Sequence, residues 1–378
     1  MTNFRLSVKR VLISFLKLFS NYRRSSNLPS GKLSFNELAS NYVVLYQCEN
    51  ALVKRKPPVT IGDVHEKFKK ALSTPLQKTF VIKAKNWRVW GNQGAVICDT
   101  NYLFSDVSKE FDNKTHSIFN QFKLVEPTYA EGNIAILTAS GSLVYYHWMM
   151  DILPRISFLK QSGIFDQIDK FIINSTLNGY QEETLERAGV QQSKIIQSND
   201  HWNFHLKAEN LIVPSLVLPL DYPSLEACTY LRQLYSNEIQ EQREPVNIYI
   251  QRLSGRKISN EAEIISFLDT LNFQVINPEK LSVAEQARIF SNARMVAGAH
   301  GAGLTNIVFC RPGAVVVDLF SPEWVNPCYW IIAEHLDLKY GYLEGIKSKQ
   351  KQKGKAADIE VDLDQLKSLF AKLLPGDR

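Results

Sequence analysis

The spacing of apolar and polar positions divides the chain into a strand-rich first part and a later part in which strands and helices alternate. Residues 80–143 are rich in Val, Ile, Thr, Tyr and Phe and contain glycine and asparagine turn signals, which predicts short strands and hairpins. From Tyr145 the pattern changes to an α/β alternation. The elements expected there are helices over 148–162, 181–188 and 225–243 and strands over 170–174 and 210–214.

Beyond Pro245 the alternation is more regular and predicts a doubly wound parallel sheet. The expected strands cover 247–251, 273–276, 294–297 and 314–319, and the expected helices cover 261–271, 283–291, 304–309 and 363–374. Ligands of such sheets bind beyond the carboxyl ends of the strands. The segments 251–257, 299–303 and 318–323 are therefore expected to meet in one crevice.

The fold class predicted from this order is α/β with two domains, and 378 residues are enough for two cores. The expected division is an N-terminal segment over 1–27, a first domain over 28–243 and a second domain over 244–378. Within the first segment, residues 4–24 form a basic amphipathic pattern whose apolar run is too short to span a bilayer. Two readings stay open, namely a helix lying on a membrane surface and a helix packed on the fold or on a partner.

A glycine-rich turn follows the strand expected over 294–297. Gly298, Gly301 and Gly303 let a ligand approach the backbone, and a helix starting near Leu304 would direct free N–H groups and its positive dipole end outward. This arrangement predicts a diphosphate site. His300 has no evident packing reason in this turn and is expected to face the ligand, although an ordinary glycine-rich turn with an incidental histidine is the alternative.

Cationic side chains follow the strand expected over 247–251. Arg252, Arg256 and Lys257 could clamp a diphosphate, since arginine can bind phosphate in bidentate geometry, although a solvated basic loop is the alternative. Asp318 and Glu323 lie near the end of a later strand, where a carboxylate could accept ribose hydroxyls or serve as a cap or surface charge.

A second cluster lies in the first domain, where His147 and Asp151 are four residues apart and would share a helix face. A histidine beside a carboxylate is a suitable general base for an alcohol. The same spacing could supply two metal ligands, although no third ligand is near, or His147 could be a buried structural histidine. His201 and His205 repeat the spacing in a loop-like stretch and are expected to be solvated or structural.

Charge and cysteine content exclude several classes. The net charge of +6 is concentrated near the N-terminus and in the tract 347–355, which suggests an anionic surface or substrate rather than nucleic acid. The five cysteines are scattered, so a disulfide framework is not expected and a reducing compartment fits best. The glycine spacing does not match the dinucleotide-binding GxGxxG motif.

Three stretches together resemble glycosyltransferase family 61. They begin at His147, Arg252 and Ala299, and they read HWMMDILPR, RLSGRKISNE and AHGAGLTN in this order along the chain. The resemblance implies a GT-B architecture of two Rossmann-like domains around a cleft, and inverting transfer from a nucleotide sugar, usually a UDP-sugar. It also implies that Arg256 and the loop 300–306 hold the diphosphate and that His147 and Asp151 lie on the acceptor side.

The resulting hypothesis is a single displacement in which His147 or Asp151 deprotonates the acceptor hydroxyl. The departing diphosphate would be stabilised by positive charge and loop amides, so no metal or other cofactor is expected. The residues expected to bind the donor are Arg252, Arg256, Lys257, His300, Gly301, Ala302, Gly303, Thr305, Asn306 and Glu323.

The expected partners are the nucleotide-sugar donor and a glycan or lipid-linked glycan acceptor, with no nucleic acid. The expected setting is cell-surface or capsular polysaccharide synthesis in the cytoplasm, peripheral to the inner membrane face. A nucleotide-sugar epimerase and a non-catalytic carbohydrate-binding protein remain alternatives.

Overall fold

The computed structural model describes most of the chain as two compact units. The described residues are 27–39, 41–49, 52–74, 78–110, 115–176, 178–198, 203–217, 222–240, 243–346 and 358–374. Within them, no helix combines the length and the apolar character needed to cross a bilayer. The basic N-terminal pattern over 4–24 and the tract 347–355 lie outside the described residues.

Unit 1 comprises residues 1–49 and 78–219, and unit 2 comprises residues 50–77 and 220–378. This division differs from the expected boundary at 243/244. The helices α7 (Leu225–Leu234) and α8 (Ser236–Gln240) belong to unit 2 because they pack on its core. Arg232 of α7 donates to the carbonyl oxygens of Val308 and Cys310 at 2.8 and 2.6 Å.

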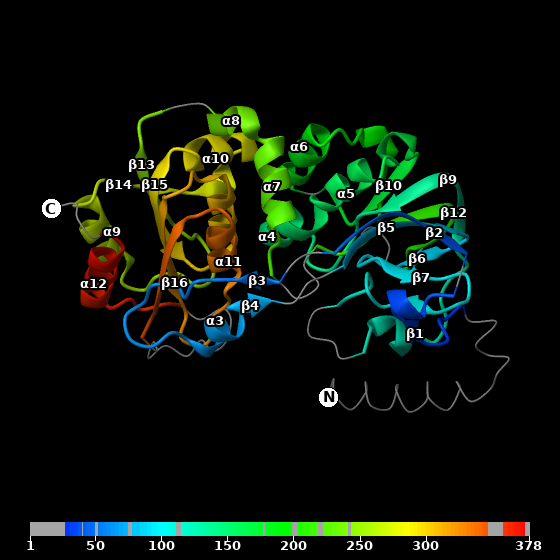
Figure 1. The fold of residues 1–378 in the computed structure, drawn as a ribbon, viewed down its shortest axis with the longest axis horizontal. Coiled ribbons are helices and arrows are strands. Elements are labelled where there is room, and N and C mark those ends of the chain that lie inside the picture. The colour runs from blue at the N-terminus through cyan, green and yellow to red at the C-terminus, as the bar shows by residue number, and fades with distance from the viewer. Residues whose placement is uncertain are drawn as a thin grey trace. The chain divides into compact units, whose positions relative to one another are not determined.

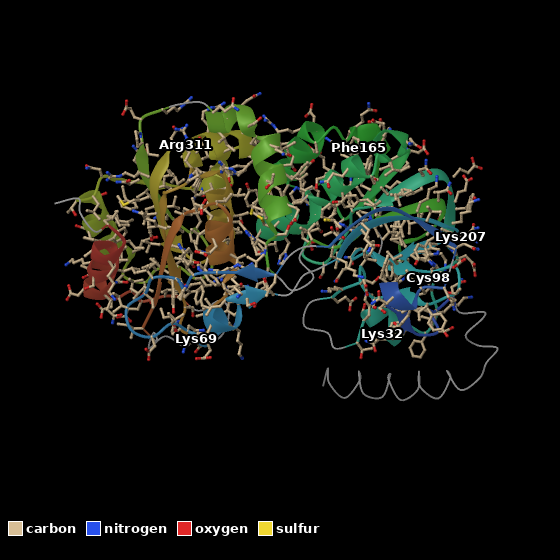
Figure 2. The ribbon with its side chains drawn as sticks, viewed as in Figure 1. Lys32, Lys69, Cys98, Phe165, Lys207 and Arg311 are labelled. Atoms are coloured by element: carbon tan, nitrogen blue, oxygen red, sulfur yellow. The ribbon has the colours of Figure 1, made fainter. Side chains whose placement is uncertain are left out.

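The same helices correct the expectation of one continuous helix over 225–243. Tyr235 leaves the helical conformation between α7 and α8 and places its ring 5.4 Å from that of Phe309. Arg311, labelled in Figure 2, donates to the carbonyl oxygen of Ile239 in α8. The break therefore lets both short helices contact the same part of unit 2.

Unit 1 is built on a mixed sheet of ten strands. Its antiparallel part confirms the short strands expected before residue 143, and it includes β5 (Lys78–Lys85), β6 (Arg88–Trp90) and β7 (Ala95–Ile97). This part also contains β2 (Tyr42–Glu49) and β8 (Leu103–Phe104), and β1 (Lys32–Leu33) joins β8 in parallel orientation. These strands extend the sheet of unit 1 beyond its α/β part, in keeping with the short strands expected in the N-terminal part.

The parallel part of unit 1 has the strand order β11-β10-β9-β12. Its strands are β9 (Thr128–Ile136), β10 (Lys170–Ile173), β11 (Ile195–Gln197) and β12 (His205–Pro214). The connecting helices are α5 (Arg155–Gln161) and α6 (Gly179–Arg187). From β9 the chain proceeds outward to β11 and then returns to the other side of β9, so the strand order reverses between β9 and β12.

Arg155 fills this reversal point of unit 1. Its guanidinium donates to the carbonyl oxygens of Leu137, Thr138 and Pro214 at 3.0, 3.3 and 2.7 Å, which joins the ends of β9 and β12. The residue is 1% exposed, and burial lowers its pKa to about 10 while the nearby Asp151 opposes that shift. Arg155 is thus the tie between the two strands that flank the reversal.

Unit 2 contains a five-stranded, fully parallel sheet with the order β14-β13-β15-β16-β17. Its strands are β13 (Val246–Ile250), β14 (Phe273–Ile276), β15 (Ala293–Ala299), β16 (Val315–Phe320) and β17 (Lys339–Glu344). Its helices include α9 (Glu261–Asp269), α10 (Val283–Phe290), α11 (Cys328–His335) and α12 (Leu363–Leu373). Figure 1 shows α9 and α12 on one side of this sheet and α10 and α11 on the other, which is the doubly wound arrangement expected.

Residues 52–74 are a part of unit 2 that the sequence pattern did not reveal. Val59 pairs with Gly341 beside β17. Phe68, in α3 (Glu66–Lys70), stacks on Tyr342 with ring centroids 4.4 Å apart. Residues 52–74 thus cover the edge of the sheet at β17. They contribute to the core of unit 2, whose main part begins at residue 220.

His205 has the structural role that was one of its two expected roles, whereas His201 lies outside the described residues. His205 Nδ1 donates to the carbonyl oxygen of Val125 at 2.6 Å, and Arg88 Nη1 lies 3.3 Å from His205 Nε2. The ring must be neutral to accept from Arg88 while donating to Val125. Burial accordingly lowers the pKa of His205 to about 4.

Replacing Arg155 by Met should destabilise unit 1 by about 3–5 kcal/mol, because three buried carbonyl groups and Asp151 lose their cationic partner. Urea denaturation followed by circular dichroism measures the loss. Lys160→Met removes an exposed cation from the same helix and should cost less than about 1 kcal/mol. Equal losses in the two variants would contradict the role assigned to Arg155.

Acidification should weaken unit 1 through His205. A folded-state pKa of about 4, below the ordinary 6.5, means that the unfolded chain binds the proton first. Stability from this group is therefore present above pH 6.5 and is lost as the pH falls toward 4, by at most about 3 kcal/mol. The difference in unfolding free energy between the wild type and His205→Gln, measured at pH 7 and pH 4.5, should shrink at the lower pH.

Candidate anion site at the strand ends of unit 2

The glycine turn lies where the strand order of unit 2 reverses. The chain enters the sheet at β13, and the next strands in sequence lie on opposite sides of it, so the reversal falls between β13 and β15. Arg252 follows β13 and His300 follows β15. The two stretches expected to meet at a ligand site therefore flank the reversal point.

Close contact between Arg252 and Gly301 explains why this position holds glycine. A Cβ atom at Gly301 would lie 1.5 Å from Arg252 Nη1. The Arg252 guanidinium also donates to the carbonyl oxygens of Gly255 and Ser254 at 2.8 and 3.3 Å. The arginine thus rests on the glycine turn and is held there by its own loop.

The other glycines of the motif serve packing. A Cβ at Gly298 would lie 3.1 Å from the carbonyl oxygen and the Cβ of Ile250, and a Cβ at Gly303 would lie 3.0 Å from Ile250 Cγ2. Both residues allow the turn to approach β13. This corrects the expectation that all three glycines serve the ligand.

The helix after the turn is η7, a 3-10 helix over Ala302–Phe309, and not the expected α-helix from Leu304. Its first N–H groups have no partner within the helix, as at any helix start. Thr305 and Asn306 are fully buried, and the Asn306 amide donates to Gln286 Oε1 at 2.5 Å and to the Gly303 carbonyl at 3.2 Å. Asn306 therefore fastens the turn to α10, and its expected contact with the donor stays a prediction.

Arg256 lies in a strained loop beside Arg252. Gly255 and Arg256 both have left-handed backbone conformations, with φ values of 54° and 49°, which costs about 1–3 kcal/mol at the non-glycine residue. The Arg256 guanidinium lies 4.6 Å from the centroid of the Trp324 ring, and its Nη1 is buried without a hydrogen-bond partner. The loop thus keeps a cation at the strand ends despite the backbone strain.

The two arginines lack a neutralising carboxylate at contact distance among the described residues. Burial lowers the pKa of Arg252, and burial together with the adjacent Arg252 lowers the pKa of Arg256. Two cations held together away from water favour an anion of two charges. A diphosphate therefore fits this site better than a neutral ligand.

His300 is buried and packed among aromatic rings, and its expected contact with the ligand stays a prediction. It is 2% exposed, and its ring stacks on Phe320 with a centroid distance of 4.5 Å. Trp324 and Tyr329 contact the same ring at 5.1 and 4.8 Å. These aromatic residues come from the end of β16, from the segment after it and from α11, so no neighbour in sequence revealed them.

Asp318 does not serve a ribose, which corrects that expectation. It is fully buried, and its Oδ2 accepts from His300 Nδ1 at 2.9 Å and from the Tyr340 hydroxyl at 2.8 Å. Glu323 is exposed, and Lys257 is exposed with its backbone N–H bonded to Asp358. The expected contacts of Glu323 and Lys257 with a donor stay predictions.

The second cluster, in unit 1, has a different character. The stretch after α4 (Tyr145–His147) is the π-helix η3 (Trp148–Ile152), and the expected continuous helix over 148–162 is interrupted at 153–154 before α5. Asp151 is 7% exposed and its Oδ1 accepts from the Val217 N–H at 2.9 Å. His147 is half-buried. The prediction that one of these two residues is a general base stays open.

Among the described residues, no group of three or more His, Cys, Asp or Glu side chains is placed to hold a metal ion. The described part of the site therefore offers arginine and histidine side chains, and not a carboxylate cluster, as its charged groups. Trp324, Tyr329 and Tyr340 are site residues that the sequence interpretation missed. The segment expected at 318–323 ended one residue before Trp324.

A parallel α/β unit with cations at its reversal point defines a class of anion- and nucleotide-binding proteins. Comparison with known proteins narrows the class, because residues 145–317 match the model of the family described as Glycosyltransferase 61. The chain is a member of glycosyltransferase family 61 through this region, which contains both the His147 cluster and the glycine turn.

Several curated proteins share part of this region. The chain is 33% identical over 89 residues to a "Beta-1,2-xylosyltransferase" of Arabidopsis thaliana, which covers 24% of the chain and 16% of that protein. It is 34% identical over 100 residues to an "EGF domain-specific O-linked N-acetylglucosamine transferase" of Gallus gallus, covering 25% and 18%. It is 39% identical over 84 residues to a "Protein O-linked-mannose beta-1,4-N-acetylglucosaminyltransferase 2" of Xenopus tropicalis, covering 21% and 14%.

The matched segment thus spans less than a fifth of each of these relatives. All three are named as transferases, so the comparisons give no support to the epimerase alternative.

Replacing Gly301 by Ala should weaken the binding of inorganic diphosphate by about 10- to 100-fold, the effect of losing a hydrogen bond to a charged group. The added methyl must displace the Arg252 guanidinium, a movable side-chain end, so the fold should survive. Isothermal titration calorimetry measures the binding. Gly179→Ala is the matched control, because nothing lies within 4 Å of its added Cβ. Unchanged binding in Gly301→Ala would show that Arg252 does not hold the anion.

Proposed function

We propose that the protein is an inverting glycosyltransferase that moves a sugar from a nucleotide sugar, a UDP-sugar in the first instance, to a hydroxyl group of a glycan acceptor. The observation that carries this proposal is the pair Arg252 and Arg256 beside the glycine turn of unit 2, without a carboxylate partner among the described residues. Membership of family 61 supports the transfer of a glycosyl group.

The proposal assigns the diphosphate to the strand ends of unit 2. Arg252 and Arg256 would bind its oxygens, and the first N–H groups of η7 would add to the positive potential. This charge stabilises the leaving group as the glycosidic bond to the diphosphate breaks. The arginines thereby do the work that a divalent cation does in metal-dependent transferases, and metal independence is part of the proposal.

The acceptor is assigned to unit 1. His147 or Asp151 would take the proton of the attacking hydroxyl, and the half-buried His147 is the more accessible of the two. Direct attack on the anomeric carbon inverts its configuration. The reversal point in each sheet supports a GT-B architecture, in which one α/β domain binds the acceptor and the other binds the donor.

The biological setting belongs to the same proposal. We assign the protein to cell-surface or capsular polysaccharide synthesis, in the cytoplasm and peripheral to the membrane, with a glycan or lipid-linked glycan as acceptor. The basic pattern over 4–24 supports membrane contact. A non-catalytic carbohydrate-binding role is the second candidate, and the buried, amide-bonded Asp151 is the observation that favours it.

A thermal-shift screen of UDP-, GDP-, CMP- and dTDP-sugars identifies the donor. A ligand at one hundred times its dissociation constant should stabilise the protein by about 2.7 kcal/mol. Arg256→Ala should remove this shift, while replacing Lys207, a half-buried cation of unit 1 labelled in Figure 2, by Ala should leave it unchanged. Absence of a shift with every nucleotide sugar would overturn the proposal.

Product analysis with the identified donor then tests the reaction. Transfer to an added glycan, with inverted configuration and without loss in EDTA, is the expected result, and His147→Ala or Asp151→Ala should lower kcat by about 100-fold or more. An isomerised donor in the absence of acceptor would indicate an epimerase. Binding without any turnover would favour the carbohydrate-binding role.

A further inference from the structure

A buried relay of three side chains joins three adjacent strands in unit 2. His300 follows β15, Asp318 lies in β16 and Tyr340 lies in β17. One carboxylate oxygen, Asp318 Oδ2, receives both His300 Nδ1 at 2.9 Å and the Tyr340 hydroxyl at 2.8 Å. All three side chains are buried, so the contacts are shielded from water.

The donors and acceptors in this relay can be assigned from its chemistry. Burial, with the neighbouring Asp318, raises the pKa of Tyr340 well above its ordinary value, so its hydroxyl keeps the proton and donates. A carboxylate can only accept, so we assign Asp318 Oδ2 as the acceptor of both contacts. His300 must therefore carry a proton on Nδ1, and its Nε2 has no partner among the described residues.

Resting on the proposed function, we infer that Asp318 and Tyr340 are positioning residues that keep the Nδ1–H of His300 on Asp318, so that Nε2 faces the donor diphosphate, takes up a proton from solvent when the diphosphate binds, and donates to a phosphate oxygen. His300 immediately precedes Gly301, on which the Arg252 guanidinium rests. The His300 ring also contacts the ring of Trp324, on which the Arg256 guanidinium packs. The His300 imidazole thus lies between Gly301 and Trp324, the residues on which Arg252 and Arg256 pack.

The surroundings restrict other roles for the relay. The ionisable groups that face it are Arg256, Tyr329 and Cys328, with Arg252 beyond the glycine turn. Asp318 is the carboxylate among them, and its Oδ1 is buried without a partner. A purely structural network would be expected to satisfy that oxygen, since an unpaired buried acceptor costs about 1–3 kcal/mol.

The experiment is nitrogen NMR on the full chain with 15N-labelled histidine. The chain has seven histidines, and His300→Gln identifies the signals of His300 by their loss. In the ligand-free protein we expect a protonated Nδ1 and an unprotonated Nε2. Asp318→Asn should populate the opposite tautomer, because its amide can donate to Nδ1. The opposite tautomer in the wild type, or an unchanged spectrum in Asp318→Asn, would overturn the inference.

Tyr340→Phe keeps the inference testable if Asp318→Asn fails to fold. It removes one donor to Asp318 and should broaden or shift the Nδ1 signal while the Nδ1–H tautomer persists. Tyr342→Phe is the matched control on the same strand, because that hydroxyl accepts from the His65 N–H at 2.8 Å. An effect of Tyr342→Phe equal to that of Tyr340→Phe would refute a specific relay.

Added UDP distinguishes the inference from the proposed function. UDP should protonate Nε2 of His300 and shift its nitrogen signal accordingly, and Asp318→Asn should weaken UDP binding by about 10-fold, because a neutral Nε2–H then replaces the charged donor. UDP that binds through Arg256 but leaves Nε2 unmoved would overturn the presentation of Nε2. Failure of UDP to bind at all would overturn the proposed function, and the tautomer would then be judged by the ligand-free spectra alone.

Discussion

The buried carboxylate of Asp318 is the constraint on which the carboxyl edge of unit 2 depends. An ionised carboxylate excluded from water is costly unless it is hydrogen-bonded and close to a cation. His300, Tyr340 and the nearby Arg256 meet that requirement. The neighbouring strands β15, β16 and β17 are therefore joined by side-chain hydrogen bonds as well as by their backbone ladders.

Arg155 is the corresponding buried charged group in unit 1, and its charge is positive. There a buried cation is bonded to backbone carbonyl groups at the ends of β9 and β12, with Asp151 nearby. In unit 1 the buried charged group lies where the strand order reverses, and in unit 2 it lies in β16, next to the strands that flank the reversal. The two units differ in whether a cation is left to bind a ligand. In unit 1 the guanidinium of Arg155 is bonded to backbone carbonyl groups. In unit 2 Arg252 and Arg256 have no carboxylate at contact distance among the described residues.

Most regular elements of unit 2 could be predicted from the sequence. The strands β13 to β16 are apolar runs bounded by turn residues, and α9, α10 and α12 have amphipathic spacing, so local pattern and tertiary position agree. The prediction was weaker where a long-range contact decides the conformation. Tyr235 breaks the helix over 225–243 because its ring packs on Phe309, and residues 52–74 belong to unit 2 because Phe68 packs on Tyr342.

The sequence by itself determined the α/β alternation, the glycine turn and the arginines after β13, because these depend on residues that are close together along the chain. It also placed the turn and the arginines at one edge, since parallel strands share their carboxyl ends. Only the tertiary structure decided which side chains are buried there. Contacts with Phe320, Tyr340 and Gln286 bury His300, Asp318 and Asn306, respectively, and these partners lie 20 to 22 residues away in the chain. Burial is a property of such distant contacts, so no local pattern could have revealed it.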